Sequence, residues 1–197
     1  MVSLLIAHHM KVALDNPVDL GQPGRVRSIV VRPARIDDVP GIQAVEVAAA
    51  ERFREIEDPR IARCADAPPY STAGLERASI EQRSWVAIDD GGSIIGFAVA
   101  WVVDGEGHLD ELAVAPPHGR RGVGRALVDE VVAWTVAKGL PSITLTTFGD
   151  VPWNGPYYEK LGFHVVSPLS PALQALVDEQ ATWGLDPTLR VVMRRSL

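Results

Sequence analysis

The sequence predicts a mixed α/β fold in which helices flank a single mixed β-sheet. Short β-branched segments alternate with segments of helical periodicity through most of the 197 residues. A strand, a helix and a second strand follow one another between residues 109 and 147, an order typical of parallel strands joined by a right-handed crossover. Apolar residues make up 47% of the chain, which is enough to form a core at this length.

The patterned part of the chain fits one domain preceded by an extension. Residues 1–27 show no clear hydrophobic period, and their Asn-Pro and Gln-Pro-Gly turns fit an extension with partial disorder, whose role the sequence leaves open. Residues 28–197 carry the regular patterns and are predicted to form the single domain.

The first half of that domain is predicted to contain a strand, two helices and a strand pair. SIVVRPARIDD contains a β-branched strand, and Asp37 is placed to cap the helix that follows. A second helix begins near Ser71 or Thr72. SWVAIDDGGSIIGFAVAWVV is predicted to form two strands joined by the Asp-Gly-Gly turn at residues 90–92.

The segment HLDELAV is predicted to be a strand whose alternate residues point to opposite faces. One face carries Leu109, Glu111 and Ala113. The opposite face carries Asp110, Leu112 and Val114, and a β-bulge in this strand would exchange the two faces.

A long helix is predicted to begin at Gly122, followed by three shorter elements and a last strand. Its apolar stripe consists of Val123, Leu127, Val131 and Trp134. SITLTTF and HVV are predicted strands, and WNGPYYEKLGF is a short helix that ends at Gly162. Ser170 caps a further helix over residues 171–183, and LRVVMRR is the last strand.

Glycines and arginines gather where the long helix begins, in AVAPPHGRRGVGRAL. The first N–H groups of a helix lack partners and lie at the positive end of its dipole, so a helix start without side chains suits a phosphate or diphosphate. The spacing fits neither a Walker loop, which needs Gly-Lys-Ser/Thr, nor a Rossmann fingerprint. A glycine-rich surface turn with solvated arginines is the alternative interpretation.

Two motifs resemble those of the GCN5-related N-acetyltransferase (GNAT) family. LDELAVAPPHGRRGVGRALVDEVV is similar to its acetyl-CoA motif, in which a strand with Leu-x-Val and a proline precede Arg/Gln-x-x-Gly-x-Gly/Ala at the start of a long helix. YYEKLGF is similar to the family's Tyr followed by Gly-Phe. The resemblance covers about residues 28–195. It implies a GNAT-type fold, with a strongly twisted mixed sheet of six or seven strands that splays between strands 4 and 5.

The resemblance also implies acetyl-CoA as cosubstrate and no metal. The residues expected to bind the coenzyme are Leu112, Ala113, Val114, Gly119, Arg120, Arg121, Gly122, Val123, Gly124, Arg125 and Asn154. Gly119 stands where the family has Arg or Gln, which leaves Arg120 or the loop backbone to contact the phosphates. Asn154 precedes Tyr158 by only four residues, whereas the family's Asn lies about two helical turns before its Tyr.

The implied chemistry is direct attack of a neutral amine on the thioester. Tyr158 matches the family's general acid, which protonates the departing thiolate. Glu111 is the predicted base, with Asp110, His108 and water as alternatives. Cys64 is expected to be a small buried thiol rather than a nucleophile.

The composition of the chain limits the classes of partner that we expect it to bind. The net charge of −6 disfavours nucleic acid, and no apolar run approaches the ~20 residues of a membrane span, so a cytoplasmic location is the default expectation. The predicted acceptor is the primary amine of a small molecule or peptide. Cationic acceptors are favoured by the acidic residues Glu46, Glu51, Glu55, Glu57, Asp58, Asp178 and Glu179.

Three points stay open on the sequence alone. A non-catalytic acyl-CoA sensor is the alternative function. A homodimer could use the exposed sheet edge or the N-terminal extension, and the helix over residues 171–183 could cover a small-molecule pocket or pack on the sheet.

The C-terminal arginines Arg190, Arg194 and Arg195 are predicted to form a solvated rim.

Overall fold

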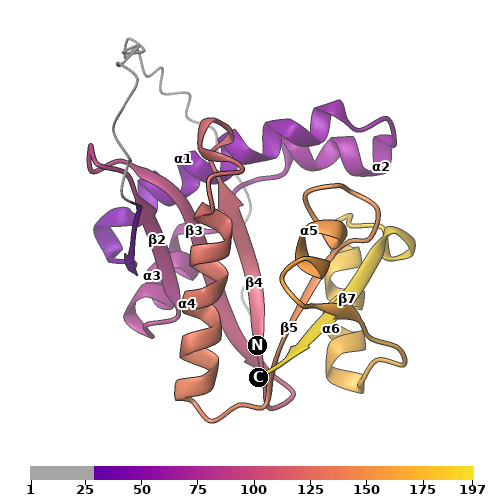
Figure 1. The fold of residues 1–197 in the computed structure, drawn as a ribbon. Coiled ribbons are helices and arrows are strands. Elements are labelled where there is room, and N and C mark those ends of the chain that lie inside the picture. The colour runs from indigo at the N-terminus through magenta and orange to yellow at the C-terminus, as the bar shows by residue number, and fades with distance from the viewer. Residues whose placement is uncertain (1–28) are drawn as a thin grey trace.

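The computed structural model describes residues 29–197, so the predicted extension lies outside the described residues. These residues form a seven-stranded sheet of order β1-β2-β3-β4-β5-β7-β6 with helices on both faces (Figure 1). Only β4 and β5 pair in parallel, which confirms the predicted mixed sheet. The strands are β1 (Val30–Pro33), β2 (Ser84–Ile88), β3 (Ile94–Val103), β4 (Glu106–Val114), β5 (Ser142–Phe148), β6 (His164–Val165) and β7 (Arg190–Ser196).

The predicted helices are found in the predicted order, and the short helix α2 and several 3₁₀ turns, which the sequence did not predict, lie between them. The α-helices are α1 (Val39–Ala50), α2 (Pro59–Ala62), α3 (Thr72–Ile80), α4 (Val123–Ala137), α5 (Gly155–Glu159) and α6 (Pro171–Thr182). The 3₁₀ turns are η1 (Ile36–Asp38), η2 (Glu51–Glu55), η3 (Arg63–Asp66), η4 (Pro116–His118) and η5 (Pro187–Leu189). Ser170 caps α6 as predicted, and Ser71 caps α3, which begins at Thr72 within the predicted start.

The start of α1 differs from the prediction at Asp37. The Asp38 carboxylate accepts from the Arg35 backbone N–H at 2.7 Å and from both terminal nitrogens of Arg32. This arrangement folds residues 36–38 into η1, so α1 begins at Val39 and Asp37 does not cap it.

Each face of the sheet has its own apolar core. Helix α4 packs its predicted stripe, including Leu127 and Val131, against Leu109 and Ile143. Helices α1 and α3 pack on the opposite face, where a second cluster includes Ile42, Leu75, Val99, Phe97 and Ala113. Full burial of one such side chain contributes about 1.5–3 kcal/mol, so both faces hold their helices firmly.

Strand β4 contains a β-bulge at Asp110. Val99 of β3 pairs with Glu111, and the next residue, Ala100, pairs with Leu109, so Asp110 is an extra residue in β4. Directly opposed residues share a face, and Val99 lies in the α1 core. Glu111 therefore faces α1.

Because of the bulge, the predicted assignment of residues 109–114 to two alternating faces is wrong at Leu109. Leu109 packs in the α4 core together with Leu112 and Val114, not on the face of Ala113 as expected. The extra residue at Asp110 reverses the alternation of faces on one side of the bulge, because β4 has one more residue than the part of β3 that it pairs with.

The parallel strands β4 and β5 diverge after a short contact. They pair only at Gly107–Ile143, His108–Thr144 and Leu109–Leu145. Strand β5 is instead paired along its whole length with β7. The edge of β4 from residue 110 to residue 114 therefore has no partner on the β5 side, which confirms the predicted splay between strands 4 and 5.

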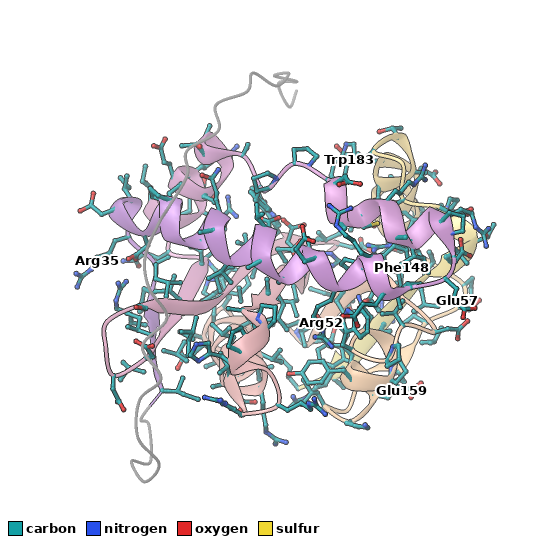
Figure 2. All side chains as sticks on the ribbon, turned by 90° about the horizontal axis from the view of Figure 1, so that it is seen from above. Arg35, Arg52, Glu57, Phe148, Glu159 and Trp183 are labelled. Atoms are coloured by element: carbon teal, nitrogen blue, oxygen red, sulfur yellow. The ribbon has the colours of Figure 1, made fainter. Side chains whose placement is uncertain are left out.

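The chain from α1 to α2 crosses above the end of the sheet at which β4 and β5 diverge (Figures 1 and 2). Below this crossing the Phe53 ring packs against Phe148 and Trp153, at centroid distances of 5.9 and 6.0 Å. None of the helices within residues 29–197 has the length and apolar character of a membrane span.

Candidate active site

The loop between β4 and α4 presents backbone N–H groups that lack partners. Within residues 29–197, the amides of residues 120–125 donate to no protein acceptor. Arg120 and Gly122 have positive φ angles of 58° and 85°, a backbone pattern typical of anion-binding nests. Gly122 occupies the cap position of α4 and supplies no side chain to close it. The unpartnered amides of this loop are therefore suited to an anion such as a diphosphate, which stays a prediction for this stretch.

The arginines of this loop lie in solvent around the unpartnered amides. Arg120, Arg121 and Arg125 are exposed, and the Arg125 Nε is 3.8 Å from the Asp129 carboxylate. Exposed guanidinium groups attract an anion over a long range without fixing its position. Gly119 lies in extended backbone just before Arg120 and has no side chain to contribute.

Two glycines shape the walls beside this loop. A Cβ on Gly124 would lie 2.7 Å from the Tyr157 Oη, so α4 and α5 approach closely there. A Cβ on Gly155 would lie 3.2 Å from the Phe148 carbonyl oxygen and would also meet Gly149, so α5 begins tightly against the end of β5. This contact fixes the position of the α5 aromatic residues.

Asn154 immediately precedes α5 and points back to β5. Its Nδ2 donates to the Thr147 hydroxyl at 2.8 Å, while its Oδ1 is buried without a partner. Buried amide oxygens rarely lack a donor, so the Asn154 oxygen is a candidate acceptor for a ligand N–H.

Three carboxyl groups gather on the α1 side of the bulge. Burial, followed by the charges of Glu46 and Asp110, raises the pKa of Glu111 to about 8. Burial is also the main cause that raises the pKa of Glu46 to about 7, although the Tyr70 backbone N–H donates to it at 2.9 Å. Neither Glu46 nor Glu111 has an ion-pair partner among the described residues.

Asp110 is held by two donors and differs from Glu111 in this respect. The Tyr70 hydroxyl and the Trp101 indole N–H both donate to its Oδ2, at 2.7 and 2.8 Å. Two such bonds fix the orientation of the Asp110 carboxyl group. Glu111 is therefore the freer of the two carboxylates that the bulge brings to this face.

His108 is enclosed and poorly suited to accept a proton. It is 1% exposed, and burial lowers the pKa of its imidazole to about 4. Its Nδ1 is 2.9 Å from the Thr144 hydroxyl, which itself donates to the Gly107 carbonyl oxygen. The geometry therefore favours Glu111 over His108 and Asp110 as a base.

Tyr158, of α5, is buried in the core on the α4 face and is close enough to Glu111 to interact with it electrostatically. Its ring packs edge-on against Tyr157 and Phe163, with centroids 5.3 and 5.8 Å away. Burial raises the pKa of the Tyr158 phenol above its usual value, and the nearby charge of Glu111 raises it further. The phenol therefore keeps its proton at neutral pH and can donate it.

Arg190 does not belong to a solvated rim as predicted. Its guanidinium donates to Thr146 at 3.0 Å and to Gln180 of α6 at 2.9 Å, and burial lowers its pKa. Arg194 also differs from the prediction, because it pairs with Glu106 at 2.8 Å. Helix α6 thus packs on the sheet and anchors Arg190, whose positive charge lowers the pKa of Glu111.

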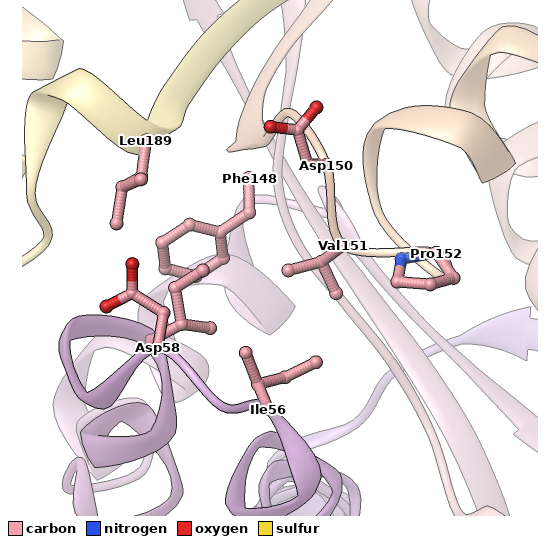
Figure 3. A pocket seen from close by; sticks show the side chains of 8 residues that line it. Ile56, Asp58, Phe148, Asp150, Val151, Pro152 and Leu189 are labelled. Atoms are coloured by element: carbon pink, nitrogen blue, oxygen red, sulfur yellow. The ribbon is translucent and has the colours of Figure 1, made fainter.

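A hollow of about 230 Å³ lies beyond the end of β5 (Figure 3). It is lined by Ile56, Asp58, Ile61, Phe148, Asp150, Val151, Pro152 and Leu189. The Phe148 ring centroid lies 5.1 Å from the Arg190 guanidinium carbon, so the hollow borders the Arg190 side of the site. Its lining is largely apolar, with two carboxylates.

Sequence reasoning missed Tyr70, Trp101 and the inward role of Arg190. No local pattern marks them, because each acts on a residue far along the chain. Cys64 was predicted to be buried but is half-buried, and burial raises the pKa of its thiol.

The unpartnered amides, the parted strands and the two motifs point to one family. A profile of the Acetyltransferase (GNAT) family matches residues 49–163, more than half of the chain. The chain belongs to this family. Membership identifies it as an acyltransferase by family and confirms the resemblance drawn from residues 109–132 and 157–163.

Solved GNAT structures share its fold at low sequence identity. PaiA N-acetyltransferase from Thermoplasma acidophilum, crystallised with coenzyme A, has a TM-score of 0.64 and 16% identity, covering 86% of this chain and 99% of that one. The ribosomal-protein-S18-alanine N-acetyltransferase from Escherichia coli has a TM-score of 0.59 and 18% identity, covering 86% and 94%. A GNAT acetyltransferase from Staphylococcus aureus Mu50 has a TM-score of 0.64 and 14% identity, covering 86% and 99%.

Proposed function

We propose that this chain is an acetyl-CoA-dependent N-acetyltransferase that acetylates the primary amine of a small molecule or peptide. The observation that carries the proposal is the run of unpartnered amides at residues 120–125. It lies beside the unpaired edge of β4 on which Glu111 is found. Family membership and the coenzyme A bound to PaiA N-acetyltransferase support the choice of coenzyme.

The coenzyme is expected to bind along the diverging strands. The amides of residues 120–125 hold its diphosphate, and the arginines of the loop attract it. The edge of β4 from residue 110 to residue 114 pairs with the pantetheine arm, as an added strand would. A backbone N–H within Leu112–Val114 then stabilises the charge that develops on the thioester oxygen, a type of contact worth about 3 kcal/mol.

Glu111 and Tyr158 divide the proton transfers between them. As the amine nitrogen bonds to the acyl carbon, the Glu111 carboxylate takes the proton that the nitrogen gives up, directly or through water. As the carbon–sulfur bond breaks, the Tyr158 hydroxyl donates its proton to the departing sulfur. Both reactants are held together in a ternary complex, which supplies much of the rate.

The acceptor is expected to approach from the α1 side. Glu46 and Asp110 lie there with Glu111, so an ammonium group is attracted to this side, releases one proton to water and attacks as the neutral amine. The largely apolar hollow beyond β5 adds a surface for the carbon skeleton of the acceptor.

Binding is tested by thermal unfolding in the presence of acetyl-CoA, CoA, ATP or NAD. We expect acetyl-CoA and CoA to raise the midpoint, because a ligand at one hundred times its Kd stabilises a protein by about 2.7 kcal/mol. ATP and NAD are expected to have little effect. A shift with ATP and none with either form of CoA would refute the proposal.

Turnover is tested by the release of free thiol from acetyl-CoA with a panel of mono-, di- and polyamines and lysine peptides. We expect amine-dependent release that Glu111→Gln greatly reduces. Stabilisation by acetyl-CoA without thiol release from any amine would instead support the acyl-CoA sensor.

A further inference from the structure

The Tyr157 hydroxyl occupies an unusual position between α5 and α4. A Cβ on Gly124 would lie 2.7 Å from this oxygen and 3.7 Å from a methyl group of Val114. Figure 1 shows α4 and α5 on either side of the carboxyl-terminal end of β4. The phenol therefore reaches from α5 to the point at which the end of β4 and the first turn of α4 come together.

The hydroxyl has no hydrogen-bond partner among the described residues, although its side chain is about half-buried. Burial, followed by the charge of Asp129, raises the pKa of the Tyr157 phenol, and Arg125 opposes this shift. The group is therefore a protonated donor at neutral pH. Partly buried tyrosine hydroxyls usually find an acceptor, so this one is available to a ligand.

The position of the Tyr157 hydroxyl, and not the backbone conformation at residue 124, is what favours a glycine there. It is the second residue of α4, and its φ lies outside the positive range that favours glycine. Any side chain there would displace the Tyr157 oxygen. The last glycine of Gly122-Val123-Gly124 thus leaves the first-turn amides open and makes room for the phenol.

We propose that Tyr157 is a coenzyme-binding residue, whose hydroxyl donates a hydrogen bond to the coenzyme between the residue 120–125 amides and Tyr158, in the space that Gly124 leaves free. The inference rests on the proposed function, because it deepens the same site. The oxygen sits where a diphosphate bound to the first turn of α4 continues into an arm beside Val114. A donor at this junction positions the thioester without touching the reacting atoms.

The test is the Kd of CoA, measured by titration calorimetry, for the wild type and Tyr157→Phe. The substitution removes one oxygen and keeps the ring against Tyr158. We expect CoA to bind about tenfold more weakly, which corresponds to about 1.4 kcal/mol, and the KM for acetyl-CoA to rise similarly while kcat changes by less than about twofold. The midpoint of thermal unfolding without ligand should stay unchanged, since the hydroxyl makes no hydrogen bond in the protein.

Gly124→Ala provides the matched variant. In the wild type its methyl group displaces the phenol, so CoA binding weakens. In the Tyr157→Phe background the nearest ring carbon lies 3.5 Å from the new Cβ, an ordinary contact, so the same change should weaken binding less. Non-additive losses of this kind support the inference.

The inference is overturned by a Tyr157→Phe protein that binds CoA within about twofold of the wild type. It is also overturned if Gly124→Ala weakens binding equally in both backgrounds, or if Tyr157→Phe lowers only the unfolding midpoint. A wild-type protein that binds no CoA would overturn this inference together with the proposed function, and is thereby distinguished from the other outcomes.

Discussion

Glu111→Gln tests which carboxylate accepts the proton. With a pKa of about 8 for Glu111, about 10% of the protein carries the free carboxylate at pH 7 and about 90% at pH 9. We therefore expect kcat/KM of the wild type, calculated on the concentration of neutral amine, to rise about ninefold between these pH values, measured by thiol release with a fixed amine. Glu111→Gln should lower kcat/KM by about 10²- to 10⁴-fold and abolish this rise.

Asp110→Asn is the matched control on the neighbouring residue. The amide keeps an acceptor oxygen for Tyr70 or Trp101 and leaves Glu111 in place. It removes a negative charge that raises the pKa of Glu111, so the rise in kcat/KM should move to lower pH with less than about tenfold loss at its plateau.

Two outcomes would refute this reasoning. If Glu111→Gln retains more than a tenth of the activity, or keeps the same pH dependence, titration of the amine and not of Glu111 sets the profile. If Asp110→Asn is the more damaging change, the bulge has given the role of base to Asp110.

The same pKa shift has a consequence for stability. Folding raises the pKa of Glu111 and Glu46, so between about pH 5 and pH 8 the folded protein binds more protons than the unfolded protein. Their contribution to stability is therefore present at low pH and is lost as the pH rises through about 8. Urea unfolding should show Glu111→Gln losing less stability than the wild type between pH 6 and pH 9.

Three further experiments test the core and the coenzyme loop by substitution. Leu127→Ala, at a fully buried position of α4, should lower the free energy of unfolding in urea by about 2–5 kcal/mol; a loss below 1 kcal/mol would contradict the packing described. Gly107→Ala places a methyl group against Thr135 and should cost about 1–3 kcal/mol, and Thr135→Ala should recover part of that loss if the clash is its cause. Arg120→Gln with Arg121→Gln should raise the KM for acetyl-CoA and weaken its salt dependence without changing kcat, whereas a KM independent of salt in the wild type would exclude electrostatic attraction.

The parts of the fold that local sequence determines could be predicted. The α4 stripe, the cap at Ser170 and the turn at residues 90–92 each follow from neighbouring residues, and the structure contains all three. The seven-strand sheet and its splay followed from the resemblance, because two motifs in the right order carry information that no single pattern holds.

The contacts around the acidic residues could not be predicted in the same way. Tyr70 and Asp110 are 40 residues apart, and Arg190 meets Thr146 across 44 residues, so neither contact leaves a periodic trace. In the sequence, nothing distinguishes Arg190 from a surface arginine, and only the packing of α6 brings Gln180 within hydrogen-bonding distance of it. Such contacts are determined by packing between distant elements and not by local preference.

The bulge reconciles two requirements that regular alternation would set against each other. Leu109 must face α4 to fill its core, and Glu111 must face α1 to lie beside Glu46, yet residues two apart in a regular strand share a face. One extra residue satisfies both requirements and ends the pairing of β4 with β5 at the same point. Asp110 is that residue, and its carboxyl group accepts hydrogen bonds from Trp101 of β3 and from Tyr70 of the loop before α3. A single local irregularity thus fills the core, frees the edge of β4 and turns Glu111 toward the α1 side.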